Sequence, residues 1–458
     1  MKKKEKKRTR PIRPVRHSRA SGTSGTRSLA LEMLGRFDQP EIGWGKRLSA
    51  FPARDRSFIK HLVSGTLRNR GLIDFYLDHF LETGAGSLPP EVLDLLRLAV
   101  FQLRFCDRVP DFAAVNEAVD LAKGLYRGRY VPLVNGVLRR LLRESDRLVL
   151  PARGEDISYR MAVEHSHPRW LVRRYIERFG PADAEALLKA NNVQAPLTLR
   201  SRSRELAGLL SGSGFETRPG TYVPEALVIE QGADPGTLPG YAKGLFYVQD
   251  EAQILVGYLA AGGGPASCVV DLCAAPGGKA CLLADLAPPG TLVLAADLSP
   301  ARLNVLRENL ERLGLDRVRL AVTDALLPAF RGAGLVLCDV PCSGTGVFRR
   351  KPGLRWRLQP EDLESLSSRQ RKIILAAGTC VAPGGVLVYS TCSIEPEENW
   401  QVIEWFLAQR SDFRLVPAQE LGTIPAALVS GRGCLELFPH LHGVDGVFAA
   451  RLELRKGV

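Results

Sequence analysis

The second half of this 458-residue chain alternates short apolar runs with segments of helical period. The apolar runs are rich in β-branched residues and lie at 269–272, 292–296, 318–322, 335–339 and 386–390, with helical segments such as 301–313 and 367–380 between them. Runs of this length without polar alternation are typical of strands buried on both faces of a mainly parallel sheet. The alternation therefore predicts an α/β, doubly wound sheet. An antiparallel hairpin of 434–438 and 446–454 should close its edge.

The start of the chain is strongly basic. Residues 1–27 hold eleven Lys or Arg against a single acid, Glu5, so they carry most of the net charge of +13. With almost nothing to bury, this segment predicts a solvated, disordered tail that is attracted to polyanions. A transit peptide is the alternative, but Pro11 and Pro14 disfavour the amphipathic helix that it requires.

Two further domains are expected between the tail and the sheet. Residues 28–150 show helical spacing throughout, for example a stripe of Val134, Leu138, Leu141 and Leu142, and predict an all-α domain. Residues 151–243 mix helical stretches with short apolar strands and predict a small α/β domain. The catalytic domain then occupies residues 244–458.

Nine cysteines are scattered along the chain, and no pair has C-x-x-C spacing. This pattern argues against a zinc site and against a disulfide framework, so we expect reduced thiols, no metal and a cytoplasmic location. There is no apolar stretch near the ~20 residues of a membrane span and no signal sequence, so we expect no association with membranes. We also expect a monomer.

A turn of small residues follows the first predicted strand of the sheet. It runs from Asp271 through Cys273, Ala274, Ala275, Pro276, Gly277 and Gly278 to Lys279. Small side chains and two glycines allow the backbone to approach a ligand closely. The turn matches neither of the glycine fingerprints that bind phosphates, which favours a ligand without a pyrophosphate.

Three acids occupy the ends of the next predicted strands, namely Asp297, Asp324 and Asp339. Ligands of doubly wound sheets bind beyond the carboxyl ends of the strands, where an acid can accept both hydroxyls of a ribose. A single acid at a strand end is usually a helix cap, but three beside a glycine turn indicate a nucleoside. S-adenosylmethionine fits, because it has one ribose, a cationic sulfur and no phosphate.

Two cysteines follow buried strands in turns, where side chains can reach a substrate. They are Cys342, in Asp-Val-Pro-Cys-Ser-Gly, and Cys392, in Ser-Thr-Cys-Ser. The remaining cysteines of the sheet, such as Cys281, Cys338 and Cys380, are expected to be small core residues. Pro396 predicts a helix start soon after Cys392, and its N-terminal dipole together with the Lys279 ammonium would favour a thiolate.

A methyltransferase needs a thiolate when its target atom is a poor nucleophile. C5 of a pyrimidine gains electron density when a thiolate adds to C6, after which C5 can accept a methyl group. An acid near N3 of the base stabilises the adduct, and Asp339 is placed for this. These residue types predict methylation of cytosine C5.

Residues 349–357 hold five cations around Trp356. This composition suits contacts to phosphates and stacking on bases, so the segment is expected to touch a nucleic acid. A solvated basic loop is the alternative.

These motifs resemble the RNA cytosine-C5 methyltransferases of the NOL1/NOP2/Sun family, and residues 28–145 resemble the RNA-binding antitermination factor NusB through Val115–Val119 and Leu133–Arg140. The resemblance implies a Rossmann-like S-adenosylmethionine-dependent domain acting on small-subunit (16S) ribosomal RNA. It also implies that Cys392 attacks C6, that Cys342 assists release, and that Lys279 and Asp339 touch the base. Ala280 departs from the family pattern, in which a hydroxyl residue is usual.

The resemblance decides between the two thiols, since DNA cytosine methyltransferases attack with the Pro-Cys cysteine instead. It further implies that Cys273–Lys279, Asp297, Asp324 and Asp339 surround the cofactor. Transfer RNA remains an alternative substrate. A non-catalytic RNA-binding assembly factor is the alternative of another class.

Overall fold

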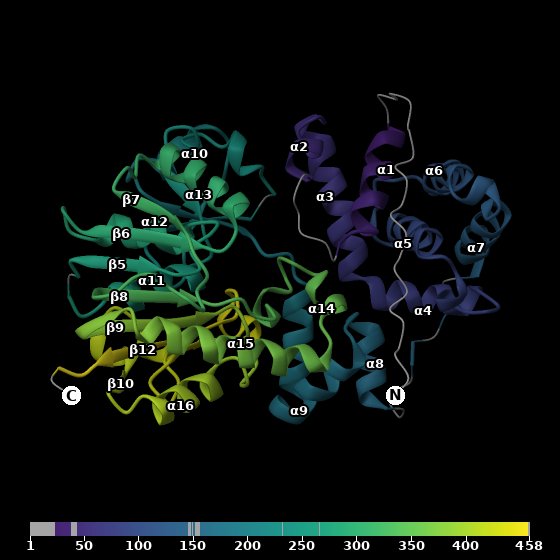
Figure 1. Cartoon of the computed structure of the whole chain (residues 1–458). Helices are drawn as coiled ribbons and strands as arrows, with labels where there is room; N and C mark the ends of the chain where they lie inside the picture. The colour runs from purple at the N-terminus through teal and green to yellow at the C-terminus, as the bar shows by residue number, and fades with distance from the viewer. Residues whose placement is uncertain are drawn as a thin grey trace. The chain divides into compact units, whose positions relative to one another are not determined.

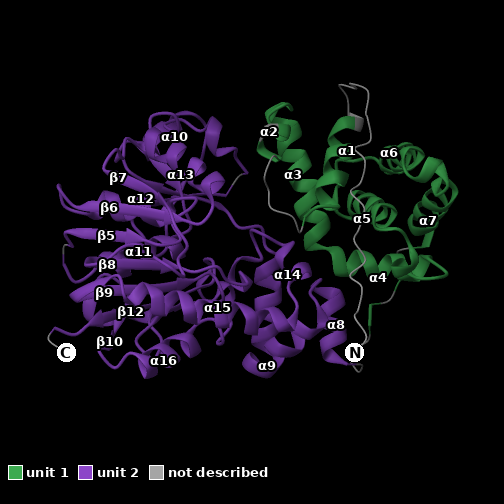
Figure 2. Ribbon diagram, viewed as in Figure 1, with its two compact units in different colours: residues 1–155 green, residues 156–458 purple. Residues whose placement is uncertain are grey.

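We describe the protein from a computed structural model of the whole chain (Figure 1). The structure describes residues 23–37, 44–144, 148, 150–151, 156–230, 232–264 and 266–456. The chain forms two compact units, residues 1–155 and 156–458 (Figure 2). Within the described ranges, no helix combines the length and the apolar character needed to cross a membrane.

The described part of the first unit is helical, as predicted. Its helices are α1 (Thr23–Leu34), α2 (Trp44–Leu48), α3 (Ala53–Arg68), α4 (Arg70–Phe80), α5 (Pro90–Phe105), α6 (Asp111–Gly124) and α7 (Val131–Glu144), with short 3-10 turns at Ala85–Ser87 and Tyr126–Gly128. Helix α5 lies at the centre and packs against α1, α3, α4, α6 and α7. A Cβ at Gly65 would lie 2.0 Å from the Phe101 ring, so α3 and α5 can approach this closely only through a glycine.

Two details of this unit differ from the sequence prediction. The helix α1 starts at Thr23, inside the segment predicted as a tail to residue 27, and Arg27 is buried. The helical domain therefore begins earlier than residue 28, whereas residues 1–22 lie outside the described residues. On α7, Val134, Leu138 and Leu141 are fully buried, but Leu142 is 37% exposed, because the buried stripe continues through Val137 instead.

The second unit opens with two helices and a small antiparallel sheet. The helices are α8 (Ile157–Glu164) and α9 (Arg169–Asn192), and α9 kinks where Gly180 adopts φ 78° ahead of Pro181. The sheet has the order β2-β3-β1-β4, formed by β1 (Leu197–Ser201), β2 (Arg218–Pro219), β3 (Ala226–Ile229) and β4 (Phe246–Val248), with α10 (Leu206–Gly212) after β1. Because β4 pairs with β1, the small sheet extends beyond the predicted boundary at residue 243.

A larger mixed sheet follows, with strands in the order β10-β12-β9-β8-β5-β6-β7 (Figure 1). Its parallel strands are β5 (Cys268–Asp271), β6 (Leu292–Asp297), β7 (Val318–Val322), β8 (Ala333–Asp339) and β9 (Val381–Thr391). One face is covered by α11 (Glu251–Ala261), α12 (Gly278–Leu286) and α13 (Pro300–Leu313), and the other by α15 (Pro360–Gly378) and α16 (Trp400–Gln409). The predicted doubly wound α/β architecture is confirmed.

The end of the chain departs from the predicted edge hairpin. The strands β11 (Leu435–Leu437) and β12 (Val447–Leu454) do pair antiparallel, but β12 also pairs with β9 and with β10 (Phe413–Val416). β12 therefore lies inside the sheet and β10 forms its edge. The predicted edge position was wrong, because the four-residue β10 carries too little apolar pattern to be recognised. Two short helices, α14 (Leu354–Arg357) and α17 (Pro439–His442), complete the unit.

Candidate active site at the carboxyl ends of the strands

The carboxyl ends of the parallel strands bring the predicted acids to one edge of the sheet. Asp297 and Asp339 are the last residues of β6 and β8, and Asp271 ends β5 between them. Asp324 lies two residues beyond β7, where its side chain accepts a hydrogen bond from Leu326 N at 2.9 Å. The predicted strand ends were correct for Asp297 and Asp339 and wrong for Asp324, because β7 ends at Val322.

The small-residue turn joins β5 to α12. Gly277 has φ 115°, a left-handed conformation that favours glycine, and a Cβ there would lie 2.2 Å from Leu306. Asp297 is almost fully buried, and its carboxylate accepts hydrogen bonds from Ala275 N at 3.3 Å and Ser299 N at 3.0 Å. The carboxylate thus holds the turn in place from the neighbouring strand.

Negative charge is concentrated beside this turn. Asp271 is buried, and burial together with the charge of Asp339 raises its pKa to about 7. The pKa of the Cys273 thiol is raised by burial and by the charges of the same acids and of Asp297. Three carboxylates therefore lie close together here, and the cations that pair with them are Lys279, 2.7 Å from Asp339, and Arg302, 3.3 Å from Asp297. This charge and the small residues Ala274 and Gly278 fit the sulfonium nucleoside predicted from the sequence.

Asp339 is held by two side chains. Lys279 Nζ donates to its Oδ2 at 2.7 Å, and Ser390 Oγ donates to its Oδ1 at 2.8 Å. Lys279 also donates to Gln253 on α11. Lys279 and Ser390 are buried, whereas the Asp339 side chain is 32% exposed. The carboxylate is therefore fixed in orientation and still accessible.

The two predicted thiols face each other. Cys342 and Cys392 follow the neighbouring strands β8 and β9, and their Sγ atoms are 3.2 Å apart. The pKa of Cys342 lies well above its ordinary value because of its hydrogen bond with Cys392, its burial, and the charges of Cys392, Glu398 and Asp339. Cys342 is therefore a protonated thiol that can donate to the Cys392 sulfur.

The predicted helix start at Pro396, whose dipole would favour a thiolate at Cys392, was wrong. The helix α16 begins at Trp400 rather than at Pro396, because residues 396–399 form a turn that is tied to the thiol loops. Tyr389 donates to Glu398 O at 2.6 Å, and Asn399 Nδ2 donates to Ser393 O at 2.9 Å. The helix dipole is thus farther from Cys392 than expected.

The basic segment at 349–357 is mainly structural. Arg349 and Arg350 pair with Asp250 and Asp445, with Arg349 Nε 2.6 Å from Asp445 Oδ1. Arg355 is fully buried and donates to the carbonyl oxygens of Ser166 and Asn191. These partners account for the three arginines within the fold, and contact of the segment with nucleic acid stays a prediction.

Sequence reasoning also missed several polar residues around the thiols. Ser390, Gln253, Gln370 and Glu398 all hydrogen-bond the predicted site residues or their neighbours. Glu398 follows the Ser-Thr-Cys-Ser motif closely, so its position was a usable signal. No sequence signal pointed to Gln370, because a glutamine on an amphipathic helix resembles a solvated residue. In the structure its exposure is 0%.

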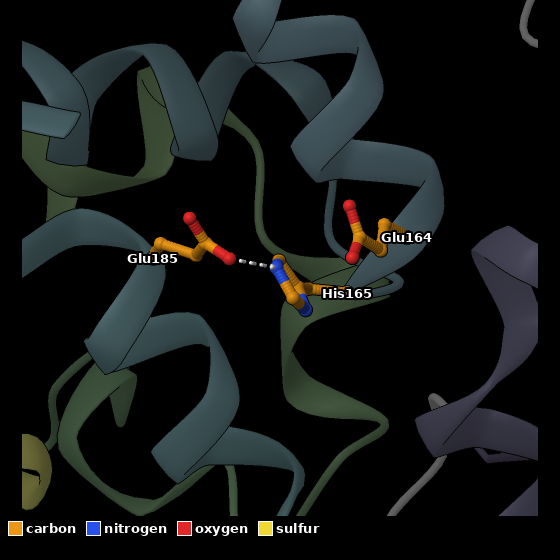
Figure 3. A group of neighbouring side chains, drawn as sticks. All are labelled: Glu164, His165 and Glu185. Atoms are coloured by element: carbon orange, nitrogen blue, oxygen red, sulfur yellow. Dashed lines mark ion pairs between the residues drawn. The ribbon is translucent and has the colours of Figure 1, made fainter. Parts of the chain in front are cut away.

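A second polar cluster lies on α8 and α9, away from the sequence motifs. The potential ligand atoms of Glu164, His165 and Glu185 lie within 4.8 Å of one another. Glu185 Oε1 lies 3.5 Å from His165 Nε2, and Figure 3 shows the glutamate pointing toward the ring. Each carboxylate already has a cation partner, since Arg160 lies 2.9 Å from Glu164 and Lys189 lies 2.8 Å from Glu185. Ion pairing accounts for this cluster.

A hollow of about 660 Å³ lies between α9, α15 and the start of α16. Its lining includes three arginines and three glutamates, which are Arg173, Arg174, Arg371, Glu177, Glu364 and Glu397. Because these positive and negative charges are equal in number, the lining of the hollow favours neither an anionic nor a cationic ligand.

Three family descriptions match consecutive parts of the chain. Residues 24–143 match the NusB family, residues 167–234 match a ferredoxin-like domain described as RsmF/B-like, and residues 264–453 match the family described as 16S rRNA methyltransferase RsmB/F. These ranges agree with the helical unit, the region of α9 and the small antiparallel sheet, and the large mixed sheet.

Similar proteins span nearly the whole chain. It is 32% identical to the probable ribosomal RNA small subunit methyltransferase B of Bacillus subtilis, over 94% of this chain and 99% of that protein. It is 36% identical to the ribosomal RNA small subunit methyltransferase B of Vibrio cholerae, over 87% and 90%. A solved structure titled Crystal Structure of PH0851 has a TM-score of 0.80 at 26% identity and covers 95% of this chain and 100% of its own. The chain therefore belongs to the RsmB/F family of 16S ribosomal RNA methyltransferases.

Proposed function

We propose that this protein transfers a methyl group from S-adenosylmethionine to C5 of a cytosine in small-subunit (16S) ribosomal RNA, through a covalent bond between Cys392 and C6. The observation that carries the proposal is the pair of thiols 3.2 Å apart beside an oriented carboxylate. Amine and hydroxyl methyltransferases need no such pair, because their target atoms attack the methyl group directly.

The chain's own residues supply each step. The Cys392 thiolate adds to C6, and the electron pair of the C5–C6 double bond moves toward C5 while Asp339 hydrogen-bonds the ring. S-adenosylmethionine supplies an electrophilic methyl group, which bonds to C5 as its bond to sulfur breaks. A base then removes the proton from C5, the double bond re-forms, and the C6–S bond breaks to return the thiolate of Cys392.

Cys342 is the proposed base, because its sulfur lies 3.2 Å from the Cys392 sulfur that bonds to C6. The first cause of its raised pKa is the hydrogen bond with Cys392. Once Cys392 is bonded to C6, its sulfur no longer carries a charge, so this cause disappears and Cys342 releases its proton to water more readily. Burial and the charge of Glu398 persist, so the thiolate of Cys342 is a strong base for the C5 proton.

The residues of the turn are proposed to hold the cofactor. The backbone from Cys273 to Lys279 would surround it, Asp297 would accept the ribose hydroxyls, and Asp324 and Asp339 would line the same crevice. Small-subunit ribosomal RNA is preferred to transfer RNA as substrate because the names of the relatives and the NusB match favour it.

The test compares two thiol variants in methyl transfer from tritiated S-adenosylmethionine to 16S ribosomal RNA from cells that lack the gene. Cys392→Ala should lower the rate by about 10³-fold or more and form no adduct. Cys342→Ala should accumulate a covalent RNA–protein complex on denaturing gels. Cys106→Ala, a half-buried thiol of the first unit, is the control and should act as wild type.

Bisulfite sequencing of RNA from cells with and without the gene identifies the substrate. A 5-methylcytosine that depends on the gene should occur in 16S ribosomal RNA. Its appearance in transfer RNA alone would overturn the proposed substrate, and methyl transfer by Cys392→Ala at the wild-type rate would overturn the proposed chemistry.

A further inference from the structure

The peptide on both sides of Cys342 is held by two buried side chains. Gln370 Nε2 on α15 donates to Pro341 O at 2.9 Å. Ser343 N donates to Glu398 Oε1 at 2.9 Å, and the Ser343 hydroxyl donates to Glu398 Oε2. Gln370 Nε2 also donates to Glu398 Oε1 at 2.8 Å, so the two side chains act as one unit. They clamp the residues immediately before and after Cys342.

The clamp is an unusual arrangement for a protein interior. Glu398 and Gln370 both have 0% exposure, and the hydrogen bonds to Glu398 come from neutral groups. Within the described ranges no cation lies within ion-pair distance of this carboxylate. In addition, Gln370 Oε1 is buried without a hydrogen-bond partner among the described residues. A buried carboxylate without a cation and an unsatisfied amide oxygen are both costly in free energy.

The clamp also reaches the second thiol loop. Glu398 lies six residues after Cys392, and its backbone oxygen accepts from Tyr389 on β9. Ser343 Oγ lies 3.1 Å from Ser393 Oγ, directly after Cys392. The side chains of Gln370 and Glu398 thus hold the Cys342 loop directly and reach the Cys392 loop only through Ser343, so the distance of 3.2 Å between the two sulfurs depends on where they hold Cys342.

We infer that Gln370 and Glu398 are positioning residues that hold Cys342 for the release step, a role which rests on the proposed function. Both side chains are fully buried and hold the peptides on either side of Cys342, so they act through the sulfur that removes the C5 proton. General bases contribute about 10²- to 10⁴-fold to a rate, and small misplacements forfeit much of this. Loss of the clamp slows release and leaves addition and methyl transfer by Cys392 largely intact.

The test uses Gln370→Met, which keeps the length of the side chain and removes both donated hydrogen bonds, and Glu398→Gln, which keeps the shape and removes the charge. Each variant is incubated with tritiated S-adenosylmethionine and 16S ribosomal RNA from cells lacking the gene. Methyl transfer in the first turnover should stay within about threefold of wild type. Repeated turnover should fall by about 10-fold or more, and a labelled RNA–protein complex should accumulate on denaturing gels.

Gln401→Met is the matched control, because Gln401 is exposed on α16 and has the same side chain. It should release RNA as wild type does. Accumulation of the adduct distinguishes positioning from damage to the fold, since a misfolded variant forms less adduct, and thermal unfolding of each variant is measured beside it. If Cys342→Ala traps the adduct and neither clamp variant does, the inference is wrong. If Cys342→Ala itself traps none, the proposed role of Cys342 fails first.

Discussion

Two groups of buried charges lie in the second unit, and they differ in how completely they are paired. Arg349 and Arg350 meet Asp250 and Asp445, two cations against two anions, and both carboxylates are at most 5% exposed. Lys279 meets Asp339, whose side chain remains 32% exposed. In the first group the two positive and two negative charges balance and the carboxylates are buried, so the group serves to hold distant parts of the chain together. The second leaves an acceptor open at the strand ends, which is what a substrate requires.

Residue type alone does not separate these two groups. Both join basic side chains to aspartates near the thiol loops, and the arginines have the composition expected for RNA contacts. The two groups differ in how many hydrogen bonds their aspartates make within the fold. Asp445 accepts from both arginines, and its own N–H donates to Asp250 Oδ1 at 3.1 Å. Substitutions in the two groups should therefore have opposite consequences, one for chemistry and the other for stability.

The largest effect is expected for the pair of Lys279 and Asp339. Lys279→Met removes the cation and one of the two hydrogen bonds that orient Asp339. On the proposed function, single-turnover methyl transfer should fall by about 10²- to 10³-fold, as when one donor to a reacting group is removed. Lys372→Met, at an exposed position on α15, is the control and should keep the wild-type rate. A Lys279→Met enzyme that works within threefold of wild type would show that Asp339 is oriented by Ser390 alone.

A smaller effect, on the free energy of unfolding and not on the rate, is expected for the group of Arg349, Arg350, Asp250 and Asp445. Arg349→Met leaves buried carboxylates with one cation fewer, so the free energy of unfolding in urea should fall by about 3 kcal/mol. The rate of methyl transfer per folded molecule should change little. Arg173→Met, whose side chain is 55% exposed in its ion pair with Asp156, should cost less than about 1 kcal/mol. A loss of RNA binding without a loss of stability would support the nucleic-acid role that the sequence suggested for Arg349.

The same contrast explains what could be predicted from the sequence. The strands β5, β6 and β8 and the second half of β9 are apolar runs, so Asp297 and Asp339 at strand ends, and Cys342 and Cys392 shortly after strands, follow from local pattern. The partners of Arg349, Arg355 and Gln370 come from distant segments, and no local pattern reports them. The position of β12 inside the sheet was missed for a similar reason, because it depends on pairing with a short strand, β10.

The smallest effect is expected for Asp271, a carboxyl group that is buried like those of the first group and lies beside Asp339 of the second. It is buried at the end of β5, and burial followed by the charge of Asp339 raises its pKa from 3.8 to about 7. The native state therefore keeps the proton on this carboxyl at pH values at which the unfolded chain has released it. The resulting stabilisation is complete below about pH 4 and is lost as the pH rises through 7.

Asp271→Asn should remove this dependence on pH. Relative to the variant, the wild-type protein should lose up to about 1.4 kcal/mol of unfolding free energy per pH unit between pH 5 and 7, because one proton is released on unfolding. Urea unfolding at several pH values measures the difference, and Asp316→Asn, at an exposed position before β7, is the control. Parallel stability curves for wild type and Asp271→Asn would mean that Asp271 is ionised throughout. Negative charge would then be even more concentrated beside the turn, and Lys279 would have to balance two carboxylates instead of one.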